Sequence, residues 1–114
     1  MVKIEIVKSL VLKIKKEFNN VEANEIIDLI ESLEDNPKKG KLLSSVGGIV
    51  IKELKYKKFR FYFISDGFKL KCLREEDLVD LLLRFVRMSD KRHQQKTING
   101  IKHILHKIGP SGFK

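Results

Sequence analysis

The sequence has very little cysteine: Cys72 is the single one among 114 residues. One cysteine cannot form a disulfide within the chain, and no Cys or His lies near it at the spacing of zinc ligands. Disulfide scaffolds and structural zinc sites are therefore not expected, and Cys72 is interpreted as a small buried hydrophobic residue. The sequence also lacks a glycine-rich phosphate loop, a Ser-His-Asp set and a carboxylate cluster, so no metal site and no cofactor is expected.

Long hydrophobic runs are absent as well. The densest apolar stretch, residues 78–86, contains Asp80 and Arg84, and it is far shorter than the roughly 18 to 20 residues that cross a bilayer. The first six residues alternate as in a strand and do not resemble a secretory signal. We therefore expect a cytoplasmic protein that does not enter membranes. A length of 114 residues, with 42% hydrophobic and 34% charged residues, predicts one folded domain spanning 1–114.

Acidic residues are the minority. There are 24 Lys and Arg against 15 Asp and Glu, a formal net charge of +9, which favours a polyanionic partner. A lysine-rich surface adapted to heat or salt gives the same balance. The charges are also separated along the chain, which predicts an acidic side and a basic side. The acidic segment contains Glu22, Glu25, Asp28, Glu31, Glu34 and Asp35, and the basic segments contain Lys52, Lys55, Lys57, Lys58 and Arg60, then Arg87, Lys91, Arg92, Lys96, Lys102, Lys107 and Lys114.

Hydrophobic periodicity predicts the order of the elements. Residues 1–6 alternate as in a strand, and residues 9–18 and 23–33 carry apolar residues at helical spacing, which predicts a helical hairpin. Residues 38–48, rich in Lys, Ser and Gly, predict a connecting loop. Strands are predicted over 49–56, 59–64 and 68–73, with a hairpin turn at 65–67, and over 82–88. Ser89 or Asp90 then caps a last helix that runs to about Lys107.

The expected fold class is therefore α+β: an N-terminal strand, a helical hairpin, an antiparallel sheet of three to four further strands, and a C-terminal helix. Side chains alternate across a sheet, so Phe59, Phe61 and Phe63 share one face of their strand, and Arg60 and Tyr62 share the other. We expect the three phenylalanines to point into the core.

This order of elements resembles the RelE/ParE superfamily of bacterial and archaeal toxins over nearly the whole chain. Residues 33–41, Leu-Glu-Asp-Asn-Pro-Lys-Lys-Gly-Lys, look like its "L-x-x-N-P-x-x-G" helix ending. Residues 51–55 and 59–63 look like its paired "E-L-R" and "Y-R-hydrophobic" strands. Residues 85–91 resemble the "G-F-x-K-K-T-x-K" segment of the HigB branch. The three motifs occur in the right order and within the expected elements.

The resemblance implies a RelE-like toxin of a toxin–antitoxin module, an mRNA interferase that cleaves mRNA on the ribosome without a metal and is neutralised by a small acidic antitoxin. When a ribose 2′-hydroxyl attacks the adjacent phosphate, fixed Arg and Lys groups stabilise the charge that develops on the phosphoryl oxygens. By position, the resemblance assigns catalytic roles to Lys55, Arg60, Arg87 and Lys91. The candidate RNA-binding residues are Lys52, Lys57, Lys58, Tyr62 and Arg92.

Two departures from the family pattern leave alternatives open. Lys91 stands where the RelE branch has a Tyr, and Phe59 stands where a Tyr is common. His93 is a candidate replacement for the missing proton-transfer group, ahead of Lys52, Lys91 and Glu53. A non-catalytic RNA-binding protein, or a ParE-like member directed at DNA gyrase, is the rival interpretation. The residues also have ordinary explanations: solvated edge lysines, a salt bridge from Arg60 to Glu53, core packing of Tyr62 and a plain surface histidine at position 93.

Overall fold

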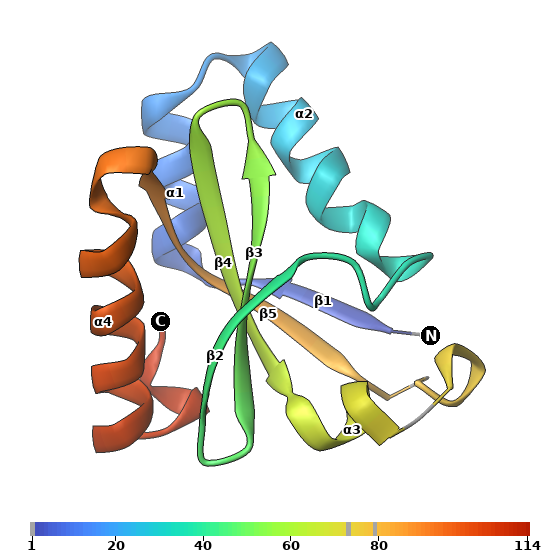
Figure 1. Cartoon of the computed structure of the whole chain (residues 1–114). Coiled ribbons are helices and arrows are strands. Elements are labelled where there is room, and N and C mark those ends of the chain that lie inside the picture. Colours follow the sequence, from blue (N-terminus) through green and yellow to red (C-terminus); the bar gives the residue numbers. More distant parts are fainter. Residues whose placement is uncertain (1, 73, 79) are drawn as a thin grey trace.

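The computed structural model describes residues 2–72, 74–78 and 80–114, and the expectation for the side chain of Cys72 lies outside the described residues. Figure 1 shows α1 behind a twisted sheet, α2 at its upper right and α4 along its left side. The elements are β1 (Lys3–Ile6), α1 (Lys8–Glu17), α2 (Asn20–Glu31), η1 (Ser32–Glu34), β2 (Lys41–Val46), β3 (Ile49–Tyr56), β4 (Phe59–Asp66), α3 (Gly67–Cys72), η2 (Glu75–Asp77), β5 (Leu82–Asp90), η3 (Lys91–His93), α4 (Gln94–Lys107) and η4 (Pro110–Gly112), where η marks a 3₁₀ turn.

The strands form one five-stranded mixed sheet in the order β1-β5-β4-β3-β2. β1 pairs in parallel with β5, from Lys3 opposite Leu82 to Ile6 opposite Phe85, and the other three pairings are antiparallel. The predicted fold class is confirmed: an N-terminal strand, two helices, four further strands in antiparallel pairing and a C-terminal helix. Among the described residues, no helix is both long enough and apolar enough to cross a membrane.

Two predicted elements are wrong. The expected loop over 38–48 contains β2, an edge strand that pairs with β3, and Gly47 and Gly48 form the turn between them with φ of 56° and 84°. The expected strand over 68–73 is replaced, over its described residues, by α3. Asp66 caps this helix, because its Oδ1 accepts from the backbone N–H of Phe68 at 3.0 Å and of Lys69 at 3.1 Å. An Asp-Gly pair favours a hairpin turn, but an Asp before a helix serves equally well as its N-cap.

The phenylalanine face of β4 packs into the core as predicted. The Phe18 ring at the end of α1 lies edge-on to Phe59, with centroids 4.9 Å apart, and Phe63 packs on Phe85 at 4.6 Å. Phe61 and Phe63 are fully buried. Each such side chain contributes about 2 to 3 kcal/mol of hydrophobic stabilisation. This layer fixes the position of β4, and with it the direction of the alternate side chains.

The opposite face of the central strands is partly covered too. Ile101 and Leu105 are the buried residues of α4, and Phe113 behind it is buried as well. Arg84 of β5 ties this C-terminal segment to the sheet, because its guanidinium donates to the carbonyls of Pro110 at 2.9 Å and Phe113 at 3.0 Å. The sheet is therefore enclosed between the helical hairpin and the C-terminal helix, and polar side chains of β3 and β4 remain beside this covered area.

Candidate functional site

Strand register brings charged side chains of four strands together on one face of the sheet, here called the Arg60 face. Residues directly opposite each other on antiparallel strands point to the same face with side chains about 5 Å apart. Two neighbouring rows result: one runs across Arg87, Tyr62, Glu53 and Lys41, and the other across Ser89, Arg60 and Lys55. The alternation predicted for Arg60 and Tyr62 therefore holds, and it places both residues in these rows.

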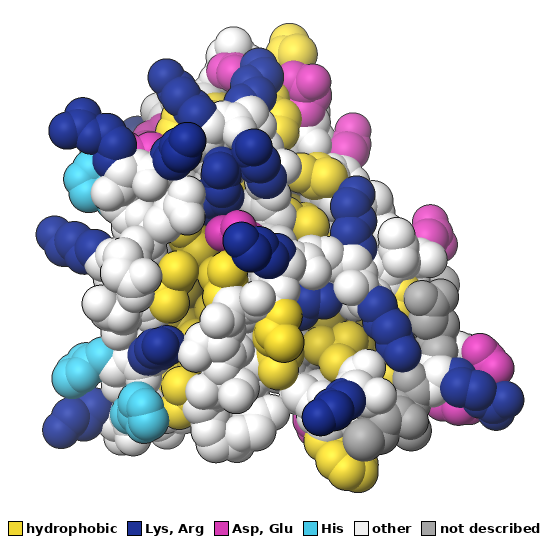
Figure 2. Space-filling model, in the orientation of Figure 1, with side chains coloured by type: hydrophobic (Ala, Val, Ile, Leu, Met, Phe, Trp, Pro, Cys, Tyr) yellow, Lys and Arg dark blue, Asp and Glu magenta, His cyan; other side chains and the backbone are white. Residues whose placement is uncertain are grey.

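A cleft of about 520 Å³ opens beside the rows, and we call it the basic cleft. Its lining combines four cationic residues, one acidic residue and apolar positions: Leu29, Lys39, Gly40, Lys41, Glu53, Leu54, Lys55 and Arg60. Figure 2 shows Lys and Arg side chains spread over the strands and beside α4, while acidic side chains gather near α2. Cations around a concave surface attract phosphate groups, because a low-dielectric wall strengthens their field.

Glu53 and Arg60 line the basic cleft without neutralising each other. Glu53 is only 9% exposed, and its Oε2 is buried with no hydrogen-bond partner. Arg60 is 8% exposed, and its Nη1 donates to the carbonyl of Phe59 at 3.2 Å. Among the ion pairs of the described residues, none joins Arg60 to Glu53, so the salt bridge considered as the ordinary role of Arg60 is not formed. Arg60 therefore keeps donors that no described hydrogen bond uses, while Oε2 of Glu53 lies buried beneath the cleft surface.

Arg87 shares the Arg60 face but does not line the basic cleft. Its Nη1 donates to the carbonyl of Val86 at 2.6 Å, and its guanidinium carbon lies 5.1 Å from the ring centroid of Phe113, a cation–π contact. Burial lowers the pKa of Arg87, which nevertheless stays charged. Arg87 lines a separate hollow of about 240 Å³ with Ser9 and Lys13. The two arginines that the resemblance places in one catalytic site therefore lie on one face of the sheet but line different hollows.

Lys91, Arg92 and His93 form the exposed turn η3 that follows β5. Asp90 caps this turn: its Oδ1 accepts from the backbone N–H of His93 at 3.0 Å and lies 2.7 Å from Nδ1 of the same residue. The hydrogen bond from His93 holds the pKa of Asp90 below its usual value. His93 thus contacts Asp90, whose register partner is Phe59 on the opposite face from Arg60.

Lys52 does not fit the predicted role in RNA binding. Lys52 lies on the face of β3 opposite to Glu53, because it pairs with Phe63. It is only 7% exposed. Its ammonium donates to the carbonyl oxygens of Lys38 at 2.9 Å and Lys39 at 3.1 Å. Burial lowers the pKa of Lys52. Two backbone carbonyls therefore hold the ammonium against the protein, which leaves it poorly placed to contact a phosphate.

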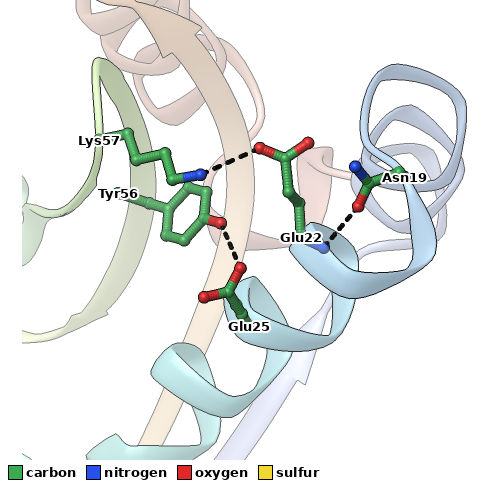
Figure 3. A network of polar contacts seen from close by, with 5 residues as sticks. All are labelled: Asn19, Glu22, Glu25, Tyr56 and Lys57. Carbon is green, nitrogen blue, oxygen red and sulfur yellow. Dashed lines mark hydrogen bonds and ion pairs between the residues drawn. The ribbon is translucent and has the colours of Figure 1, made fainter.

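Side chains at the β3–β4 turn contact helix α2 (Figure 3). Lys57 has φ of 53° and its Nζ lies 3.2 Å from a carboxylate oxygen of Glu22, which raises the pKa of Lys57. The hydroxyl of Tyr56 donates to Glu25 at 3.0 Å. Lys57 and Lys58 are both exposed, and Lys57 is paired with the acidic helix α2.

Tyr62 is the second candidate RNA contact that does not fit its predicted role. The residue is fully buried, and its hydroxyl shares a hydrogen bond of 2.7 Å with Oγ of Ser89. Burial raises the pKa of the Tyr62 phenol. Stacking needs an open ring face, and Tyr62 offers none, so it belongs to the core beneath the basic surface.

Lys39 and Lys41 are the lining residues that sequence reasoning missed. Both belong to the Asn-Pro-Lys-Lys-Gly-Lys run, whose pattern resembles a helix ending and does not by itself predict a binding role. Lys41 begins β2 opposite Glu53, and this position was hidden because 38–48 was interpreted as a loop. The pairing of β2 with β3 was the missing information.

Comparisons with known proteins add no relative. No family model, no curated protein and no solved structure matches the chain. Within the described residues, no group of three or more His, Cys, Asp or Glu side chains is placed to hold a metal ion. The resemblance to the RelE/ParE superfamily therefore rests on the motifs and the order of the elements.

Proposed function

We propose that the protein is a RelE/HigB-like toxin of the cytoplasm, a ribosome-dependent, metal-free endoribonuclease that a small acidic antitoxin neutralises. The observation that carries the proposal is the basic cleft, which Lys41, Lys55 and Arg60 line together with Glu53. Phosphodiester backbones bind clustered Lys and Arg side chains, and the release of counterions drives that binding. The net charge of +9 supports the same class of partner.

The proposed reaction follows from the chemistry of this lining. The ribose 2′-oxygen attacks the adjacent phosphorus, and the bond from phosphorus to the 5′-oxygen breaks, which gives a 2′,3′-cyclic phosphate and a 5′-hydroxyl. Glu53 accepts the proton of the 2′-hydroxyl, because it is the acidic residue among those that line the basic cleft. Arg60 stabilises the charge on the phosphoryl oxygens. The ammonium of Lys55, exposed at the cleft, protonates the leaving 5′-oxygen.

The test is cleavage of ribosome-bound mRNA, with mapping of the RNA ends. We expect Arg60→Ala to lower the cleavage rate by about 10²-fold while the circular dichroism spectrum stays unchanged. Lys16→Ala is the matched control, because it removes an exposed positive charge on α1, away from the basic cleft. Cleavage by Arg60→Ala at the wild-type rate would refute the proposed site. A loss in Arg87→Ala equal to that in Arg60→Ala would extend the site across the sheet, as the resemblance implies.

A non-catalytic RNA-binding protein, or a ParE-like inhibitor of DNA gyrase, is the second candidate. The position of Lys91 favours it, because the RelE branch has a Tyr there and η3 contributes no residue to the basic cleft. Growth arrest on expression without cuts in translated messages would support this candidate over the nuclease. An unchanged cleavage rate and pH profile in His93→Ala would remove His93 from proton transfer.

A further inference from the structure

Lys52 buries an ammonium group inside the protein, on the side of β3 opposite to the charged rows. A buried charge costs stability unless hydrogen bonds compensate it. Two acceptors do so here, and both are backbone carbonyls of the segment that precedes β2, at Lys38 and Lys39. The ammonium also lies 5.8 Å from the ring centroid of Phe63. Lys52 therefore joins the middle of the sheet to a connecting segment.

The joined segment lies close against the sheet. Gly40 has φ of 107°, and a β-carbon on it would come within 2.9 Å of the Phe63 ring and 3.2 Å of the Glu53 carbonyl. At the other end, the N–H of Lys39 donates to the carbonyl of Asn36 at 3.1 Å, which closes a turn after Pro37. Residues 36–40 thus connect η1 to β2 along a path that leaves no room for an added side chain at Gly40.

This segment supplies two cations to the basic cleft. Lys39 and Lys41 both line it, and Lys41 faces Glu53 across the strand pair. We propose that Lys52 is a positioning residue for RNA: by holding the carbonyls of residues 38 and 39, it fixes Lys39 and Lys41 where they contact RNA phosphates. Lys52 itself does not contact RNA. This inference rests on RNA binding by the basic cleft, as proposed above, and is independent of whether the RNA is cut.

The test is a thermodynamic cycle of RNA affinities, measured with a fluorescein-labelled single-stranded RNA. It compares the wild type, Lys52→Met, Lys39→Gln/Lys41→Gln and the triple variant at several salt concentrations. Met fills the space of the lysine stem without a donor. We expect Lys52→Met to weaken binding by about tenfold in the wild-type background and by less than about twofold in the Lys39→Gln/Lys41→Gln background. Lys16→Met removes the same charge away from the cleft and should leave affinity within about twofold of wild type.

Salt dependence separates positioning from direct contact. Each phosphate contact to single-stranded RNA contributes about 0.7 to the slope of log affinity against log salt. Lys39→Gln/Lys41→Gln should lower that slope by about 1.4 if both lysines contact phosphates. Equal weakening by Lys52→Met in the two backgrounds, or no weakening in either, would overturn the inference. A wild type that binds no RNA would refute the proposed function and with it this role.

A second measurement tests the positioning without RNA. Amide hydrogen exchange of residues 38–41 should speed up in Lys52→Met while exchange in β4 stays slow. Unchanged exchange in 38–41 would show that the ammonium does not hold the segment, and would overturn the inference whatever RNA does. Lys52→Gln, which keeps a shorter donor, serves if Lys52→Met does not fold. Failure of both variants to fold would assign Lys52 to the stability of the whole domain, against a positioning role.

Discussion

The hydrogen bond between Tyr62 and Ser89 offers a direct measure of whether Tyr62 is a core residue. The two oxygen atoms are 2.7 Å apart, Tyr62 is fully buried and Ser89 is 6% exposed. Tyr62→Phe keeps the ring, removes the bond and leaves the serine hydroxyl without this partner. A buried bond contributes about 1 kcal/mol, and an unsatisfied buried group costs about 1 to 3 kcal/mol. We therefore expect Tyr62→Phe to lower the free energy of unfolding by about 1.5 to 2 kcal/mol.

The double variant sharpens this prediction. Tyr62→Phe/Ser89→Ala removes both partners and leaves no orphaned hydroxyl, so its loss should be smaller than the sum of the two single losses by about 1 kcal/mol. Urea unfolding of the four proteins measures the coupling, and each 1 kcal/mol shifts the melting temperature by about 4 to 8 °C. Additive losses would refute the buried pair. We expect Tyr62→Phe to leave RNA affinity unchanged. A base-stacking tyrosine on the surface would differ in stability, because removal of its hydroxyl would not lower the free energy of unfolding.

Two further predictions concern a glycine and a carboxylate. Gly40→Ala should destabilise the protein by about 2 to 3 kcal/mol in urea unfolding, because of the φ of 107° and the 2.9 Å approach to Phe63. Gly100→Ala, in α4 with no atom near the added carbon, should instead stabilise it by about 0.5 to 1 kcal/mol, and the same sign for both would contradict the reasoning. The pKa of Asp90 is lower in the folded protein, so the unfolded chain binds the proton first as pH falls. The contribution of Asp90 to folding stability is therefore present above the usual pKa of 3.8. It is lost as pH falls through the lowered pKa. Asp90→Asn should therefore differ from wild type in urea unfolding near neutral pH and converge with it in acid, and a gap that stays constant would remove Asp90 from the acid dependence.

Sequence patterns predicted the elements whose signals are local. The helical hairpin and the paired strands β3 and β4 follow from apolar spacing within each segment, and Asn19 caps α2 by accepting from the backbone N–H of Glu22 at 2.8 Å. The strand β2 was not predicted, because its Leu-Leu-Ser-Ser sequence has no alternation and its strand conformation depends on pairing with β3. The helix α3 was not predicted, because Asp66 and Gly67 fit both a hairpin turn and a helix N-terminus, and tertiary context decides between these two structures.

The candidate site shows the same difference between features set by local sequence and features set by contacts between distant segments. Strand parity placed Arg60 on the correct face, because alternation needs no knowledge of other elements. Parity alone did not show that Lys52, on the other face, would bond to the carbonyls of residues 38 and 39. It also did not reveal that the Arg87 guanidinium rests on Phe113, a residue 26 positions later in the chain. Contacts between distant segments decided which cations remain available.

The parallel pairing of β1 with β5 has a consequence for folding during synthesis of the protein. β1 ends at Ile6, and its strand partner begins at Leu82, so the first strand finds its place in the sheet only after most of the chain has been synthesised. Contacts so distant in sequence slow folding, because the loop must close before the pairing stabilises it. A nascent chain that stops before β5 has neither β1 in the sheet nor Arg87 in its row, and the native surface appears only after β5 has been synthesised.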